Sequence, residues 1–146
     1  MRRAEYFANA RDPKTLTVQQ VMEDAVFTVS PDTKGITIAE IMTERNFGTV
    51  PVVTEDLTLV GLVSEFDLLR VIDEGKDLRQ VTAEEIMTND VVSVTEEMPV
   101  MDFISLLQER HLVRTPVVRG KTLVGIASRR DAVFGYVKAT AKYWWP

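Results

Sequence analysis

Two short runs in this chain of 146 residues place a serine and an aspartate three positions apart. They are GLVSEFD at positions 61–67 and GIASRRD at positions 125–131. Each reads as an apolar strand that leads directly into a helix. The N–H groups of a helix start favour anions, and a carboxylate accepts hydrogen bonds from hydroxyls, so the runs suit a polar ligand. The same spacing also suits a helix cap, and both interpretations are open from the residues alone.

Glycine begins both runs, at Gly61 and Gly125, inside the predicted strands. Glycine weakens a strand but permits another group to approach the backbone closely. We therefore expect these two positions to allow a ligand near the strand.

The runs belong to a tandem repeat, which should be sought before any fold is assigned. The segment Thr17–Met22 returns 65 residues later as Thr82–Met87, and both copies have the spacing of a capping box. Farther along, Thr49–Val53 corresponds to Arg114–Val118, with a proline at the third position of each. A proline there indicates the first residues of a strand or an edge strand.

Each copy is predicted to contain strand, helix, strand, tight turn, strand and helix. The first strands are 26–29 and 91–94, and the last helices are 64–73 and 128–137. A helical connection favours parallel strands, and a tight turn favours an antiparallel hairpin. The fold class is therefore α/β, with two pseudo-symmetric βαββα repeats. A unit of about 55 residues is marginal by itself, so we expect the repeats to pack as one module.

The predicted organisation has five parts. They are an N-terminal arm (1–16), a first repeat (17–73), a linker (74–81), a second repeat (82–137) and an aromatic C-terminal tail (138–146). The tail contains Trp144 and Trp145, which we expect to cover apolar surface on this chain or on a second copy.

Composition argues against several classes of protein. The chain has no cysteine and one histidine, so disulfides, thiolate chemistry and a multi-histidine metal site are excluded, and a cytoplasmic location is expected. The net charge of −5 disfavours nucleic acid as a partner. The sequence contains no run with the length of a membrane span and no signal peptide. We expect no enzymatic activity and no required cofactor.

The proline-containing strand and the Gly-x-x-Ser-x-x-Asp junction, present in both copies, resemble the tandem cystathionine-β-synthase (CBS) domain pair, or Bateman module. The resemblance covers roughly residues 17–137. It implies a cleft between the repeats that often binds adenosine nucleotides. It also implies a regulatory, non-catalytic role toward a separate effector protein, and association into a homodimer.

The resemblance also assigns roles to particular positions. It gives the aspartates Asp67 and Asp131 to the ribose hydroxyls, and the serines Ser64 and Ser128 to nearby polar contacts. The implied adenine slot lies among Val26, Val91, Thr49, Val50 and Thr115. Arg114 matches a basic position in nucleotide-sensing members of the family. Arg129 and Arg130 lie inside the second junction and are further cations that could bind phosphate.

The two copies differ where charge matters. The second copy has Arg114 where the first has Thr49, and arginines 129 and 130 where the first has Glu65 and Phe66. We therefore expect unequal sites, with the one at residues 128–131 preferred, although the arginines could instead serve the site at Asp67. The leading hypothesis is a sensor of AMP, ADP or ATP. The alternative is a dimerisation or protein-interaction module whose sites are empty or hold another adenosyl ligand, such as S-adenosylmethionine or NAD(H).

Overall fold

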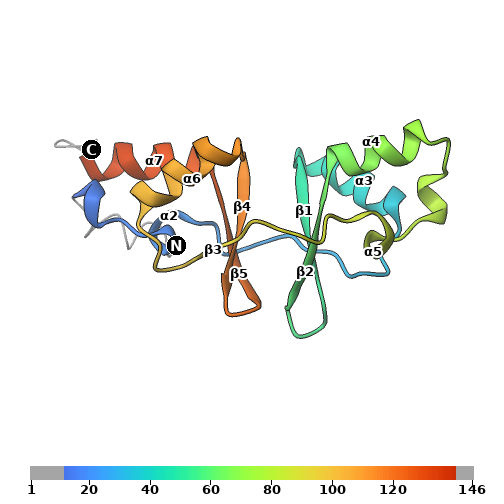
Figure 1. The fold of residues 1–146 in the computed structure, drawn as a ribbon, viewed down its shortest axis with the longest axis horizontal. Helices are drawn as coiled ribbons and strands as arrows, with labels where there is room; N and C mark the ends of the chain where they lie inside the picture. The colour runs from blue at the N-terminus through green and yellow to red at the C-terminus, as the bar shows by residue number, and fades with distance from the viewer. Residues whose placement is uncertain (1–11, 141–146) are drawn as a thin grey trace. The chain divides into compact units, whose positions relative to one another are not determined.

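The computed structural model describes residues 12–140 as a mixed α/β chain in two compact units (Figure 1). We call Phe27–Val91 with Lys121–Leu123 the Ser64 unit, and the rest of the chain the Ser128 unit. The helices are η1 (Pro13–Thr15), α2 (Val18–Val21), α3 (Gly35–Arg45), α4 (Glu65–Asp73), η2 (Leu78–Gln80), α5 (Ala83–Ile86), α6 (Val100–Arg110) and α7 (Arg129–Thr140). The strands are β1 (Thr49–Val53), β2 (Leu59–Ser64), β3 (Val94–Thr95), β4 (Arg114–Arg119) and β5 (Thr122–Ser128).

The Ser64 unit is organised around the antiparallel pair β1 and β2, as the tight turn predicts. Helices α3 and α4 lie on the same side of this hairpin (Figure 1). Ile38 and Met42 from α3 and Leu68 and Val71 from α4 bury their side chains in one apolar core with the strand valines. The hairpin register sets Thr49 opposite Ser64, so two predicted site residues face each other across the strands.

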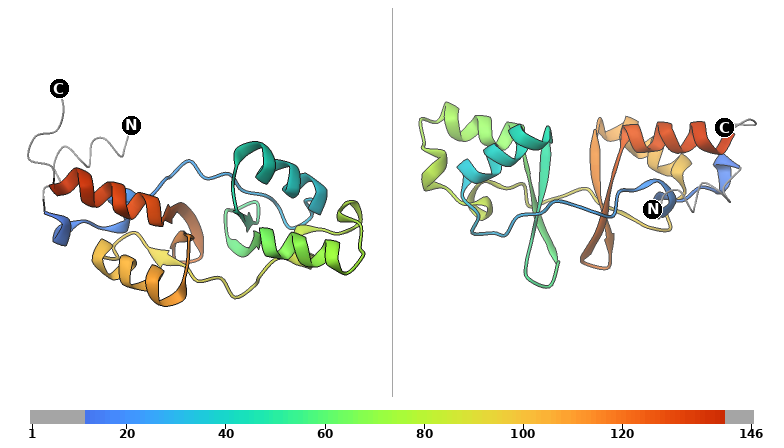
Figure 2. Two further views of the ribbon diagram at one scale, coloured as in Figure 1. Left: turned by 90° about the horizontal axis from the view of Figure 1, so that it is seen from above. Right: turned by 180° about the vertical axis from the view of Figure 1, so that it is seen from behind.

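The Ser128 unit repeats this plan with a sheet in the order β3-β4-β5. Phe103 and Leu107 from α6 and Ala132 from α7 are buried with strand residues in its core. One face of α6 is therefore buried against the strands. Figure 2, seen from above, shows α6 running alongside α7. Helix α6 ends at Arg110, and His111 after it is the C-cap residue in the left-handed conformation.

The first strand of each copy is shorter than predicted. Pairing in the first copy is a single parallel bridge between Val29 and Val52, and in the second it is β3, which begins at Val94. Val29 donates to Pro51 O (3.0 Å) and accepts from Val53 N (2.9 Å). The next step of this parallel ladder would need an N–H on Pro51, which proline lacks. The expected strands 26–29 and 91–94 are therefore corrected to these short pairings.

The two short helices α2 and α5 begin with the predicted capping boxes. Thr17 with Gln20, and Thr82 with Glu85, form capping boxes at α2 and α5. Helix α3 begins at Gly35, after the Ser30–Asp32 and Ser30–Thr33 hydrogen bonds that hold residues 30–33 in a turn.

The compact units do not coincide with the two sequence repeats. Helix α2 precedes the first repeat's strands, yet its Val18 N donates to Met98 O (2.9 Å) in the Ser128 unit. Helix α5 opens the second repeat, yet Ala83 N donates to Thr33 O (2.8 Å) in the Ser64 unit. The Ser128 unit therefore contains the short helix α2 of the first repeat, and the Ser64 unit contains the short helix α5 of the second repeat. The domain limits given above remain predictions about the sequence repeats.

Both predicted end segments fall largely outside the described residues. Of the arm, residues 12–16 are described, with Leu16 buried in a small cluster in the Ser128 unit. Trp144 and Trp145 lie outside the described range, so their expected covering role stays a prediction.

Candidate functional site

Both serine–aspartate pairs form complete helix caps where a strand meets its helix. Asp67 Oδ2 accepts from Ser64 N at 2.8 Å, and Asp131 Oδ2 accepts from Ser128 N at 2.9 Å. In return, each serine Oγ accepts from the aspartate N–H, at 3.3 Å and 3.0 Å respectively. An aspartate is thus long enough to close a reciprocal cap that usually uses Glu or Gln. Capping is therefore a real role of all four residues, and any ligand role adds to it.

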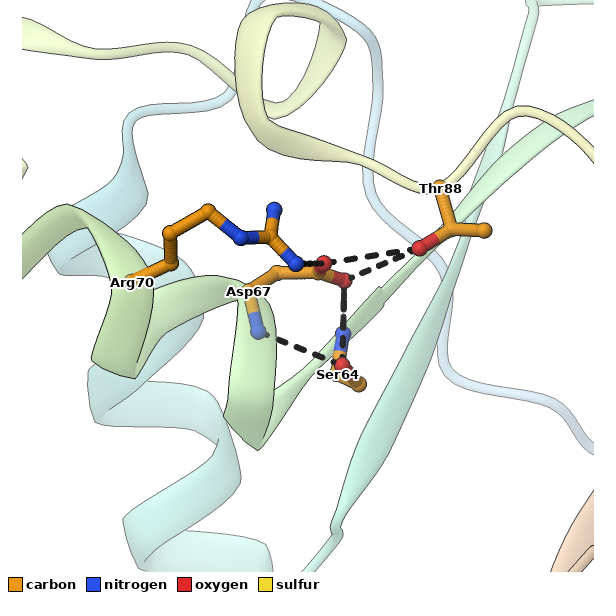
Figure 3. Close-up of polar contacts among 4 residues, drawn as sticks. All are labelled: Ser64, Asp67, Arg70 and Thr88. Carbon is orange, nitrogen blue, oxygen red and sulfur yellow. Dashed lines mark hydrogen bonds and ion pairs between the residues drawn. The ribbon is translucent and has the colours of Figure 1, made fainter.

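The Asp67 carboxylate in the Ser64 unit is sealed inside a polar cluster (Figure 3). It is 2% exposed and lies 3.3 Å from Arg70 Nη2. Thr88 Oγ1, from the segment after α5, lies 3.4 Å from each carboxylate oxygen. Ser64 Oγ donates a further bond to Oδ2 at 3.0 Å. Both oxygens of this carboxylate are therefore engaged by the protein itself.

The Asp131 carboxylate in the Ser128 unit is in a different environment. It is half-buried, whereas Asp67 is fully buried. The position that corresponds to Thr88 is Glu23, which keeps the backbone bridge, to Ile126, but replaces the hydroxyl with a carboxylate. The two junctions thus share a backbone plan and differ in the groups that surround the aspartate.

Arg114 is the cation that the structure brings near this junction. It is half-buried at the first residue of β4. Burial lowers the pKa of Arg114, and the negative charge of Asp131 opposes that shift. Because arginine stays protonated over the physiological range, Arg114 presents a fixed positive charge beside the carboxylate.

Arg129 and Arg130 form the exposed first turn of α7. Arg129 N donates to Val113 O at 3.0 Å, which ties the helix start to the start of β4. The structure therefore places Arg114, Ser128, Asp131 and the two exposed arginines in one neighbourhood of the Ser128 unit.

Two buried hydroxyls stand near the starts of β1 and β4. Among the described residues, the Oγ1 atoms of Thr49 and Thr115 are buried without a hydrogen-bond partner. A buried hydroxyl without a partner costs free energy, about 1–3 kcal/mol in mutational data. Both threonines are among the site residues predicted from the sequence, and their unpartnered hydroxyls give them a physical reason to contact a ligand.

The expected apolar slot is only partly assembled within either unit. Val50 is fully buried in β1 opposite Val63. Val26 and Val91 are half-buried and lie at the last position before the chain passes to the other unit. As a result, Val26 is not in the unit that contains Thr49, and Val91 is not in the unit that contains Thr115.

The role expected for the two strand glycines is wrong. A Cβ at Gly61 would lie 2.2 Å from Met87 Sδ, and one at Gly125 would lie 2.6 Å from Met22 Sδ. The space that each glycine leaves beside its strand is therefore filled by the methionine that follows α2 or α5, and not by a ligand. Met22 and Met87 are equivalent in the repeat, so both copies use the same packing.

A separate groove of about 560 Å³ lies in the Ser64 unit, away from the junction. Its lining includes Asp32, Glu55 and Glu84 and none of the predicted site residues. Within residues 12–140, no cluster of three or more acidic or histidine side chains is arranged to hold a metal ion. A groove with three carboxylates does not suit phosphate, so it does not compete with the junction as a nucleotide site.

Sequence reasoning missed two members of the Asp67 cluster. Arg70 stands three residues after Asp67 on the same helix, and that spacing could have revealed it. Thr88 gave no signal, because it reaches Asp67 only through the bridge between Leu62 and Thr88.

Comparison with known protein families matches the CBS domain twice, at residues 18–74 and 83–137. An uncharacterised protein of Methanopyrus kandleri, MK0525, is 33% identical over 121 residues, which is 81% of this chain and 61% of that protein. The CBS domain-containing protein YhcV of Bacillus subtilis is 32% identical over 79% of this chain and 81% of its own length. The chain thus spans less than two thirds of the first relative.

Solved structures share the fold. The protein CBSX2, solved in complex with AMP, is 28% identical, has a TM-score of 0.77 and is matched over 86% of this chain and 98% of its own. The chain therefore belongs to the CBS domain family and contains a tandem CBS domain pair. Such a pair is generally a regulatory module without catalytic activity. No helix in the described part of the chain is both long and apolar enough to cross a membrane.

Proposed function

We propose that this protein senses adenine nucleotides (AMP, ADP or ATP) at the Ser128–Asp131 junction and signals the bound state to a separate protein. The observation that carries the proposal is the half-buried Asp131 carboxylate beside the half-buried Arg114. A carboxylate can accept bonds from both hydroxyls of a ribose diol, and a guanidinium can bind phosphate. A nucleotide needs both groups together.

The neighbouring groups fit the same ligand. Arg129 and Arg130 are exposed at the start of α7, where the helix N-terminus also favours an anion. The unpartnered Thr115 hydroxyl lies next to Arg114 in β4, and a ligand oxygen or a bridging water would satisfy it. The structure of CBSX2 with AMP supports an adenine nucleotide as the first ligand class to test.

The Ser64–Asp67 junction is the weaker candidate. A ribose there would have to displace Thr88 or Arg70 from a carboxylate that is fully buried. Desolvation and the loss of existing bonds oppose that exchange. We therefore propose one high-affinity site per chain, in the Ser128 unit.

Output from such a module requires partners. We propose that the chain acts as a homodimer in the cytoplasm and regulates an effector protein. The absence of cysteine is consistent with a reducing compartment. The net charge of −5 makes nucleic acid an unsuitable effector.

Thermal unfolding with AMP, ADP, ATP, GTP, S-adenosylmethionine and NADH tests the proposal. A ligand at a hundred times its dissociation constant should stabilise the protein by about 2.7 kcal/mol. Asp131→Asn keeps an oxygen that can cap the helix but removes the negative charge. We expect it to lower the ligand-induced shift strongly, while the equivalent Asp67→Asn retains most of it.

A second pair of variants tests the phosphate contact. Arg114→Gln should weaken a nucleotide but not adenosine, whereas Arg110→Gln, an exposed change on α6 in the same unit, should leave both unchanged. Absence of a shift with every adenine nucleotide on the wild-type protein would refute the sensor.

The second candidate is a dimerisation or interaction module without a nucleotide, or with another adenosyl ligand. The complete caps at both junctions favour it, because they explain the serine–aspartate pairs without a ligand. The same thermal panel separates the two candidates. A shift with S-adenosylmethionine or NADH alone would support this second reading.

A further inference from the structure

The groove in the Ser64 unit, which the nucleotide proposal does not use, has the size of a small-molecule site. It lies where the segment 28–32, the end of β1 with the turn after it, and Glu84 of α5 come together. All of these residues belong to one compact unit. The groove volume is about 560 Å³, and ligand pockets in proteins measure roughly 300–1,000 Å³. A small organic molecule therefore fits the space.

The lining of this groove is negatively charged. Asp32, Glu55 and Glu84 contribute three carboxylates, and the lining contains no lysine, arginine or histidine. The hydrogen bond from the Ser30 hydroxyl lowers the pKa of Asp32, so this carboxylate is ionised at neutral pH. A concave surface lined by one sign of charge concentrates ligands of the opposite sign. The groove therefore favours a cation.

The rest of the lining favours an organic cation over a metal ion. Val29 and Val53 are buried beneath the groove, and Leu57 is 50% exposed at its rim. Such apolar surface suits the alkyl chain of a ligand that ends in a charged group. Within residues 12–140, the carboxylates do not form a cluster of three that could hold a metal ion.

The second copy of the repeat has the same backbone frame at the equivalent place. Glu84 N donates to Pro31 O at 2.9 Å, and the equivalent Gln19 N donates to Glu96 O at 3.0 Å. An offset of 65 residues relates both members of the two pairs. Side chains at this place can therefore be compared directly between the Ser64 unit and the Ser128 unit.

In the Ser128 unit this place is occupied by a guanidinium from the chain itself. Arg119 Nε and Nη2 lie 2.9 Å and 2.8 Å from Glu96 Oε1, and Glu96 is 5% exposed. Arg119 is the repeat equivalent of Thr54, and Glu96 is that of Pro31. Thr54 and Pro31 both line the groove of the Ser64 unit. The first copy thus lacks the internal guanidinium and has an open groove with carboxylates instead.

We propose that the groove of the Ser64 unit binds a small alkyl guanidinium at the place that Arg119 occupies in the Ser128 unit. Glu55 and Glu84 accept charge-assisted hydrogen bonds from the guanidinium, whose planar fork suits carboxylates. The alkyl part lies against Pro31 and Leu57. This site is separate from the Ser128–Asp131 junction and does not depend on nucleotide binding there.

Titration of the full chain with agmatine, followed by NMR of the backbone amides at low salt, tests the proposal. We expect saturable shifts centred on the lining residues, and weaker binding as added salt screens the exposed carboxylates. Glu55→Gln and Glu84→Gln should each raise the dissociation constant about tenfold, the effect of losing one hydrogen bond to a charged group. The matched control Glu40→Gln removes an exposed acid on α3 of the same unit and should leave binding unchanged.

Transfer of the ion pair from the second copy provides an independent test. Pro31→Glu combined with Thr54→Arg places an internal guanidinium in the groove and should abolish agmatine binding. Pro31→Ala combined with Thr54→Ala loses the same native side chains but leaves the groove open, so it should still bind. Circular dichroism verifies that both double variants are folded. Undiminished agmatine binding by the folded Pro31→Glu, Thr54→Arg variant would overturn the proposed place of the ligand.

The choice of probes identifies the ligand chemistry and its source. Agmatine should bind more tightly than putrescine, which has amines alone, and equal binding would overturn a guanidinium site. Tighter binding of the peptide Gly-Gly-Arg-Gly-Gly than of agmatine would support the same chemistry with an arginine of a partner protein as its source. Absence of agmatine binding to the wild-type protein, or binding unaffected by both glutamine variants, would refute the inference and leave the nucleotide proposal to the thermal panel.

Discussion

Replacing Asp67 should destabilise the protein far more than replacing its equivalent, Asp131. Asp67 is 2% exposed and accepts bonds from Ser64 N and Ser64 Oγ, with Thr88 Oγ1 and Arg70 also near. Loss of the helix cap costs about 1 kcal/mol, and loss of bonds to a buried charged group costs about 1.5–3 kcal/mol. We therefore expect Asp67→Ala to lower the free energy of unfolding by about 3 kcal/mol.

The equivalent Asp131→Ala should cost about 1 kcal/mol, because this half-buried carboxylate loses mainly its cap. The exposed Arg70 adds little to the difference, since ion pairs at the surface contribute about 0–1 kcal/mol. Sequence alone would predict equal effects, because both aspartates stand in the same motif.

Urea denaturation followed by far-ultraviolet circular dichroism measures both changes. For a chain of this size, about 3 kcal/mol corresponds to a fall in Tm of about 6–12 °C, against about 2–4 °C for 1 kcal/mol. Asp67→Asn keeps an acceptor for Ser64 N but loses the charge, so it should fall between wild type and Asp67→Ala. Equal losses for the two alanine variants, or a larger loss for Asp131→Ala, would refute the claim that Asp67 is the sealed structural site.

Two further predictions concern packing and pH. Gly61→Ala should destabilise the Ser64 unit by about 1–3 kcal/mol, because the new Cβ would overlap Met87 Sδ. In a double-mutant cycle measured by denaturation, adding Met87→Ala should recover part of that loss. Additive losses of stability in the two single variants would contradict this contact. The hydrogen bond from the Ser30 hydroxyl lowers the pKa of Asp32 in the folded protein. The ionised Asp32 carboxylate therefore stabilises the fold at pH values above its unfolded-state pKa. This stabilisation is lost as the pH falls through the lower, folded-state pKa. In an NMR titration, Ser30→Ala should raise the Asp32 midpoint toward its ordinary value, and an unchanged midpoint would argue against the bond.

Local features were predictable because their partners are close in sequence. The capping boxes of α2 and α5 each involve residues three apart, and so do the serine–aspartate caps. The hairpins could be recognised for the same reason, and the internal repeat could be recognised because the same residue patterns return after 64–65 residues.

The first strands show where local reasoning fails. Val26–Val29 has the β-branched composition of a strand, yet only Val29 pairs. The limit is set by Pro51 on the neighbouring strand, which has no N–H to offer at the next step. The β-strand propensity of residues 26–29 depends on those residues alone, so it cannot reveal that the neighbouring strand lacks an N–H donor at Pro51.

The sequence by itself determined the repeat, the α/β class, the helix caps and the charges that differ between copies, because these depend on short spacings and residue types. Only the tertiary structure decided that Met87 and Met22 fill the space beside the strand glycines, and that Thr88 lies against the buried Asp67 carboxylate while Asp131 stays half-buried. These facts follow from the exchange of short helix segments between repeats. Contacts between segments that are distant in sequence depend on how the backbone brings them together. The two Ser-x-x-Asp motifs are nearly identical, so they do not specify which distant residues surround each aspartate.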